Sequence, residues 1–236
     1  MAKHGILGLA IASALFMSGC DPDAEQPIET DPAVWSDASR AYAALGSDVQ
    51  DALADCNVDA TEFDRLMALS QRAFDQDFQG GWRTVAEREG CKSVAGDLIL
   101  AYMQYSHPTP PDSLGILRWH AGQMKAMAGE TTQALALFAG SYESEESLEW
   151  NFYVDATLAF LEGDRDGVIA AYDALSEVKV SPEQTAARQR FLDENPTIRM
   201  PDGYLTDPIN LPVIRRLRDC FGQPYTIAYK GCDTNE

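Results

Sequence analysis

Apolar residues recur at steps of three and four along three stretches of the chain. The stretches run from Trp35 to Leu53, from Phe63 to Phe78 and from Val94 to Tyr105. This spacing places the apolar side chains of each stretch on one side of a helix. Segments rich in Gly, Pro and polar residues separate the stretches, and strict alternation of apolar and polar residues over strand lengths is almost absent. The pattern therefore predicts an all-α fold.

Two later segments, 114–142 and 148–178, each have the pattern of a helix, a glycine-containing turn and a second helix. The residues at matching positions are Gly129, Ala134 and Phe138 in the first segment and Gly163, Val168 and Tyr172 in the second. The two sets are 34 residues apart. Small residues, Gly122 and Ala156, stand seven positions before each turn glycine, where the backbones of a helical hairpin approach closely. We expect the aromatic residues of the second helices to fill the space between successive hairpins.

This 34-residue period resembles that of the tetratricopeptide repeat, a helical hairpin that stacks into an α-α superhelix. The resemblance lies in the turn glycine, the small residue before it, and the small and aromatic pair of the second helix. The segments depart from the family at the early Trp position, which holds Arg118 and Phe152, and at the first-helix Tyr position, which holds Lys125 and Ala159. The resemblance implies a short tetratricopeptide-like array. Unrelated hairpins in a helical bundle are the alternative.

In the repeat family, the first helix of each hairpin lines a concave groove. The candidate groove residues that this resemblance implies are Trp119, Gln123, Trp150, Tyr153 and Thr157. Aromatic side chains at such places can anchor a peptide or a partner helix. The alternative is that neighbouring helices bury these side chains, and we expect this for Phe160 and Leu161, which map to the same groove.

The first nineteen residues have the layout of a secretory signal peptide, with Lys3 before an apolar run from Ile6 to Met17. The run is short for a membrane-spanning helix and ends at Cys20 in the order Met-Ser-Gly-Cys. This order resembles the lipobox of bacterial lipoproteins, which implies acylation of Cys20 and a membrane anchor facing the periplasm. In enteric lipoproteins an Asp after the cysteine, here Asp21, favours the inner membrane over the outer membrane. An ordinary signal peptide with an incidental cysteine is the alternative.

Charge and cysteine content narrow the choice of partners. The chain has 18 Lys and Arg against 37 Asp and Glu, a formal net charge of −19, which repels phosphate backbones and excludes nucleic acid as a partner. Four cysteines follow Cys20, and an exported chain can join them in two disulfides. We expect the local pairs, Cys56 with Cys91 and Cys220 with Cys232.

These observations predict four regions. They are a signal peptide at 1–19, an acidic proline-containing tether at 20–33, a helical repeat domain at 34–193, and a C-terminal extension at 194–236 packed on that domain. The extension contains a short apolar helix between proline-rich segments, and we expect Cys220 and Cys232 to clip this irregular appendage.

The chain offers little catalytic chemistry. Ser176 and Lys179 match the S-x-x-K motif of penicillin-binding enzymes, but the partner motifs S-D-N and K-T-G are missing. His107 and His120 stand without the HExxH motif, so we expect neither a metal nor a cofactor. The sequence favours a non-catalytic adaptor that binds an envelope protein. An envelope hydrolase with a serine-lysine site and a small-ligand carrier are the alternatives.

Overall fold

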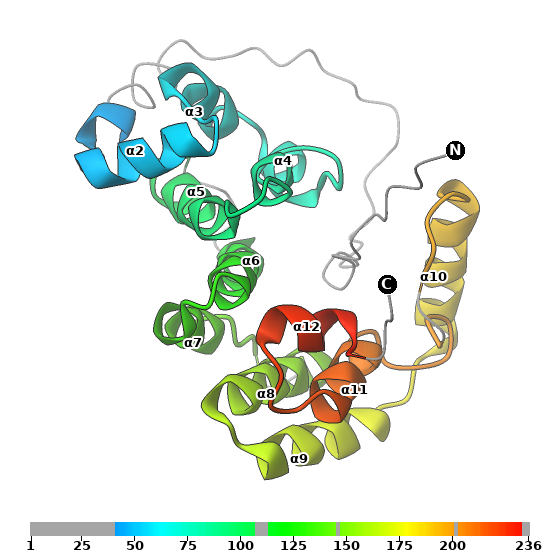
Figure 1. Ribbon diagram of the computed structural model, residues 1–236. Coiled ribbons are helices and arrows are strands. Elements are labelled where there is room, and N and C mark those ends of the chain that lie inside the picture. The colour runs from blue at the N-terminus through cyan, green and yellow to red at the C-terminus, as the bar shows by residue number, and fades with distance from the viewer. Residues whose placement is uncertain (1–40, 107–112, 145–146, 201–202, 233–236) are drawn as a thin grey trace, which may run out of the picture. The chain divides into compact units, whose positions relative to one another are not determined.

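The computed structural model describes residues 41–106, 113–144, 147–200 and 203–232 (Figure 1). In these ranges the regular elements are helices and no strand occurs, so the all-α prediction is confirmed. None of the described helices combines the length and the apolar character needed to cross a bilayer.

The described residues form two compact units, 41–141 and 142–232. The division falls between the two predicted repeats, whereas the sequence placed both in one domain at 34–193. The predicted signal peptide, the lipidation site Cys20, and the tether lie outside the described residues.

The unit 41–141 is built around α5. Its helices are α2 (Ser47–Asp55), α3 (Ala60–Met67), the π-helix η1 (Arg72–Gln76), α4 (Arg83–Ala86), α5 (Lys92–Tyr105), α6 (Ser113–Met127) and α7 (Thr131–Ala139). Helix α5 packs against α3, α4 and α6, and α7 packs against α6. The predicted apolar stripes supply this core, because Phe63, Phe74 and Leu98 are fully buried.

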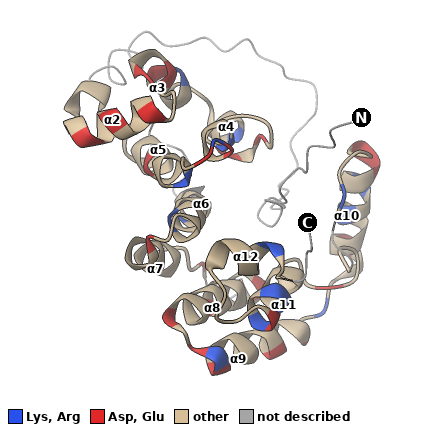
Figure 2. Cartoon of the chain, in the orientation of Figure 1, with Lys and Arg blue, Asp and Glu red and all other residues tan. Residues whose placement is uncertain are grey.

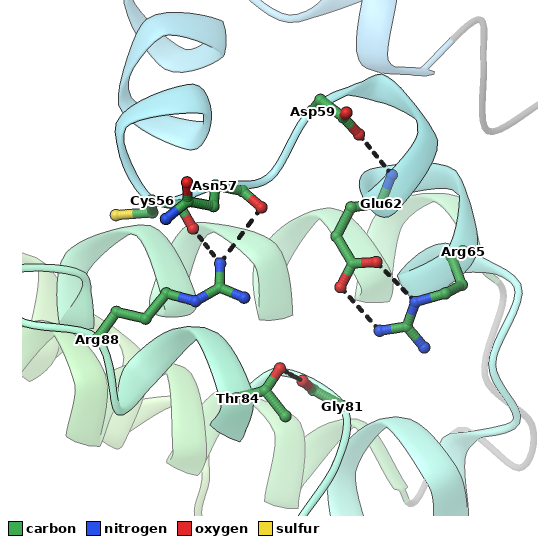
Figure 3. Close-up of polar contacts among 8 residues, drawn as sticks. All are labelled: Cys56, Asn57, Asp59, Glu62, Arg65, Gly81, Thr84 and Arg88. Carbon is green, nitrogen blue, oxygen red and sulfur yellow. Dashed lines mark hydrogen bonds and ion pairs between the residues drawn. The ribbon is translucent and has the colours of Figure 1, made fainter.

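Polar contacts fix the turns of this unit (Figure 3). The backbone N–H of Glu62 donates to the Asp59 carboxylate (2.9 Å), which caps α3. The guanidinium of Arg88 donates to the carbonyl oxygens of Cys56 and Asn57. Asn57 has a φ of 53°, so these hydrogen bonds stabilise a left-handed turn at a residue that is not glycine.

Two helical hairpins occupy the predicted repeat segments. The first joins α6 and α7 at Gly129, and the second joins α8 (Leu148–Glu162) and α9 (Arg165–Ser176) at Gly163. The two glycines have φ values of 83° and 78°, which an L-residue with a side chain rarely adopts. A Cβ at Gly122 would lie 2.9 Å from the Phe138 ring, so the close approach expected inside the first hairpin is present.

The unit 142–232 contains α8, α9, α10 (Pro182–Glu194), α11 (Leu211–Asp219) and α12 (Tyr225–Lys230). Helix α11 packs against α8, α9 and α12 (Figure 1). Its side chains Val213, Ile214 and Leu217 are buried, so the C-terminal segment completes the core of this unit. A capping box of Ser181 and Gln184 begins α10.

Three arginines gather on α11 (Figure 2) and attach it to its neighbours. Arg215 forms an ion pair with Asp207 (3.5 Å). The Nε–H of Arg216 donates to the carbonyl oxygen of Tyr229 in α12 (2.8 Å). The guanidinium carbon of Arg218 lies 4.0 Å from the ring centroid of Tyr172 in α9.

Both expected cysteine pairs lie at disulfide-bonding distance. The Cα atoms of Cys56 and Cys91 are 5.8 Å apart, and those of Cys220 and Cys232 are 5.6 Å apart. The first pair joins the end of α2 to the start of α5, and the second pair encloses α12.

Replacement of Gly81 by alanine tests the tight turn that follows η1. Gly81 has a φ of 54°, and a Cβ there would overlap the carbonyl group of Phe74. We expect Gly81→Ala to lower the free energy of unfolding by about 3 kcal/mol. Gly90→Ala is the matched control, because Gly90 also has a positive φ but open space around it. The control should cost about 1 kcal/mol. Equal losses in urea denaturation would contradict the overlap.

Candidate functional site

A buried carboxylate is the centre of the polar contacts in the unit 41–141. Asp75, in η1, is fully buried. Its Oδ1 accepts from the indole N–H of Trp82 (2.9 Å) and from Nδ1 of His120 in α6 (2.6 Å). The side-chain amide of Gln76 donates to Oδ2. We call Asp75, Gln76, Trp82 and His120 the Asp75 cluster.

The local chain path brings these groups together. After η1, the left-handed turn at Gly81 lets the N–H of Trp82 donate to the carbonyl oxygen of Phe74 (3.3 Å). The Phe74 ring stacks on Tyr102 of α5 at a centroid distance of 3.9 Å. The guanidinium of Arg83 donates to the backbone carbonyl of Asp75 and lies over the Trp82 ring (4.2 Å). Asp75 thus joins η1, the turn that carries Trp82, and α6.

The surroundings keep this carboxylate ionised. Burial by itself raises the pKa of Asp75, but the charge and hydrogen bond of His120, the hydrogen bond of Trp82 and the charge of Arg83 together lower it below its ordinary value. The negative charge also acts on Tyr102, because burial and Asp75 raise the pKa of that phenol to about 12. The Tyr102 hydroxyl therefore stays protonated and donates to the carbonyl oxygen of Leu69 (2.7 Å).

A second buried charge lies on α6, the helix that carries His120. The ammonium group of Lys125 is almost fully buried and lies 2.7 Å from Asp97 and 3.0 Å from Glu130. It also donates to the Ser93 hydroxyl (3.0 Å). Burial raises the pKa of Glu130, but hydrogen bonds from Ser93 and Lys125 outweigh it and lower the pKa. Lys125 occupies the position where the repeat family has Tyr, so this departure places an ion cluster between α5, α6 and the start of α7.

An aspartate bonded to Nδ1 of a histidine is the arrangement that orients imidazole in hydrolytic and metal sites. Within the described ranges, no three His, Cys, Asp or Glu side chains are grouped so that they could hold a metal ion. The serine that the sequence offered, Ser176, belongs to the unit 142–232, and its hydroxyl donates to the carbonyl oxygen of Asp173 (2.7 Å). Lys179 is exposed. The contacts of His120 are those of a packed histidine that joins α6 to η1.

The groove candidates lie in the interior. Buried side chains are Trp119, Gln123, Trp150, Tyr153 and Thr157, and Phe160 is buried as expected. In this conformation these residues belong to the core, which is the alternative that the sequence left open. Leu161 is half-buried.

The C-terminal helix covers part of α8. The Tyr153 hydroxyl is hydrogen-bonded to Tyr229 of α12, and burial together with the nearby tyrosines raises the pKa of Tyr153 well above 10. The ring centroid of Phe160 lies 5.7 Å from that of Phe221 and 6.0 Å from that of Tyr225. Helical spacing puts Tyr153, Thr157 and Phe160 on one side of α8, which we call the α8 face. Helix α12 and Phe221, which precedes the turn into α12, lie against that face.

The sequence analysis missed Asp75 and Lys125. A weak signal existed for both, because each charged residue stands within an apolar helical stretch. Pattern alone does not distinguish a buried charge with partners from an exposed one, since the partners of Asp75 come from 7 and 45 positions away.

Comparison with protein-family models, curated proteins and solved structures found no match to this chain.

We expect Asp75→Asn to lower the free energy of unfolding of the full chain by about 3 kcal/mol, because it removes the charge that His120 and Arg83 face. Asp51→Asn, at an exposed position of α2, is the control and should change it by less than about 0.5 kcal/mol. Urea denaturation, with hydrogen exchange of α5 as a local readout, measures both. A loss for Asp75→Asn no larger than the control would contradict the structural importance of this carboxylate.

The same carboxylate predicts acid sensitivity. Its pKa in the folded chain is below the ordinary value of 3.8. A lowered pKa contributes stability that is present above the unfolded value and lost as the pH falls through the folded value. The free energy of unfolding should therefore fall below about pH 4 more steeply in the wild type than in Asp75→Asn. Parallel pH profiles of the two proteins would contradict this assignment.

Proposed function

We propose that this chain is a lipid-anchored, non-catalytic adaptor of the bacterial cell envelope that binds a partner protein through tetratricopeptide-like hairpins. One observation carries the proposal. Two consecutive hairpins turn at left-handed glycines 34 residues apart, Gly129 and Gly163. Farther along the chain, beyond α10, α11 packs against both α8 and α9 and covers the second hairpin.

The anchor explains how such an adaptor would work. Several acyl chains on Cys20 would hold the chain at a membrane surface, which a single chain does only weakly. Confinement raises the effective concentration of the helical units toward envelope partners. The inner membrane is favoured by Asp21, and the outer membrane is the alternative for the same anchor.

Exposed apolar side chains give places where contact with a partner can be detected. In the unit 142–232, Leu148 at the start of α8 is 51% exposed, and Ile227 on α12 is 45% exposed. About half of each side chain faces solvent, so a photo-crosslinking residue at either position can reach a partner.

Photo-crosslinking in the native envelope tests the adaptor function. We expect crosslinkers at Leu148 or Ile227 to capture one defined envelope protein, which the purified chain then binds directly. Asp51 on α2 is the control position, since it is exposed but lies in the other unit. Equal capture at all three positions, or no direct binding of the captured protein, would contradict the proposal.

Labelling with an alkyne fatty acid tests the anchor separately. The wild-type chain should incorporate the label, and its first residue should be Cys20 carrying acyl groups in mass spectra. Cys20→Ser should lose the label completely, whereas replacement of Cys220 and Cys232 by serine should keep it. An unlabelled wild-type chain, or one that begins at another residue, would exclude lipid anchoring.

A further inference from the structure

We propose that α12 is a removable cover on the α8 face, that the Cys220–Cys232 disulfide holds it in place, and that a thiol reductant releases it. The uncovered face then binds a partner helix that carries two aromatic residues four positions apart. This inference rests on the proposed adaptor function and names the binding surface and its regulation.

The contacts that α12 makes indicate which side chains a partner helix needs on the α8 face. Helix α12 has only six residues, and it turns Tyr225, Ala228 and Tyr229 inward while Ile227 faces solvent. The two tyrosines are one helical turn apart, and they lie against Phe160 and Tyr153. A partner helix with aromatic residues at the same spacing can make the same contacts, because helices that bind grooves use anchors at such positions.

The disulfide adds a covalent restraint to the packing of this short helix on α11. A helix of six residues is too short to be stable in water without other contacts. The carbonyl oxygen of Tyr229 accepts from Arg216 (2.8 Å), and the cysteines on either side of α12 are 12 positions apart. Closing a loop of this size favours the closed state by about a hundredfold.

The two disulfides differ in access to solvent. Cys56 and Cys91 are each 5% exposed, so both sulfur atoms of that bond lie in the core. Cys220 is 4% exposed, but its partner Cys232 is exposed. Cys232 is therefore the cysteine of the two disulfides that a thiolate from solution reaches most readily. The backbone N–H of Cys232 also donates to Sγ of Cys220 (2.8 Å), which favours Cys220 as the leaving thiolate.

The release is a thiol-disulfide exchange with a dithiol. One thiolate of the dithiol attacks Sγ of Cys232, the Cys220–Cys232 bond breaks, and Cys220 leaves as a thiolate that takes up a proton. The second thiol of the dithiol then attacks the mixed disulfide and releases Cys232 as a thiol. The dithiol leaves as its own disulfide, so the two electrons gained by the cysteine pair come from it.

The first experiment asks whether α12 opens. Oxidised full chain is treated with dithiothreitol, and hydrogen exchange and cysteine alkylation are followed by mass spectrometry. We expect Cys220 and Cys232 to be alkylated before Cys56 and Cys91, and α12 amides to exchange about a hundredfold faster while α8 and α9 stay protected.

Two variants separate the cover from general unfolding. Cys220→Ser with Cys232→Ser should give fast α12 exchange without reductant, and Cys56→Ser with Cys91→Ser should leave α12 exchange unchanged. Unchanged α12 exchange in the first variant would overturn the cover, and so would equal loss of protection in α8 and α9.

The second experiment asks whether the uncovered face binds a helix. The probe is a fluorescent peptide with the sequence of residues 221–231, measured by anisotropy. Its binding should be at least tenfold tighter to the chain with Cys220→Ser, Cys232→Ser and Tyr229→Ala than to the oxidised wild type, because the last change weakens the internal competitor. A peptide with alanine at both tyrosines should not bind.

The results distinguish this inference from the adaptor function itself. If α12 opens but the peptide does not bind, the α8 face is not the partner surface, whereas capture at Leu148 or Ile227 still decides whether the chain is an adaptor. If the peptide binds but no envelope protein is captured, the face is functional as a groove and the adaptor function fails.

Discussion

One buried carboxylate determines how the unit 41–141 is assembled. Asp75 takes hydrogen bonds from Trp82 and His120 on a single oxygen, and these donors come from segments far apart in the sequence. Loss of one of these partners would leave the buried charge partly uncompensated and would cost several kcal/mol of folding free energy. The η1 turn, the Trp82 segment and α6 therefore keep their positions relative to one another. The left-handed turn at Gly81 and the stacking of Phe74 on Tyr102 serve the same geometry, because both fix the π-helical turn that carries Asp75.

Much of the fold was predictable because it depends on local pattern. The apolar stripe that contains Leu98 became the core helix α5, whereas the stripe from Phe63 to Phe78 is divided between α3 and η1. The glycines at 129 and 163 became left-handed turns, since only the residue itself and its close neighbours decide this feature. The cysteine pairs followed from their number and nearness in the chain. The boundary between the two units was not predictable, because it depends on which helices pack together.

The candidate sites were harder to predict because they depend on long-range contacts. The repeat resemblance mapped Tyr153 and Phe160 to a groove and left open whether Tyr153 is buried, and it gave no sign that the C-terminal helix lies against them. Lys125 broke the repeat pattern for a reason that only its partners Asp97 and Glu130 reveal. A sequence pattern indicates the side of the helix on which a residue lies. The residues that pack against it are determined by the tertiary fold.

The interiors of the two units are held together by different kinds of interaction. In the unit 41–141 the interior contains charges that are paired with other charges, and paired charges are costly to separate. In the unit 142–232 the α8 face is closed by aromatic contacts and a hydrogen bond to a short helix, and these contacts hold no charge in the interior. Uncharged aromatic contacts separate at a lower cost than paired buried charges, so the cover of the α8 face is the weaker of the two closures.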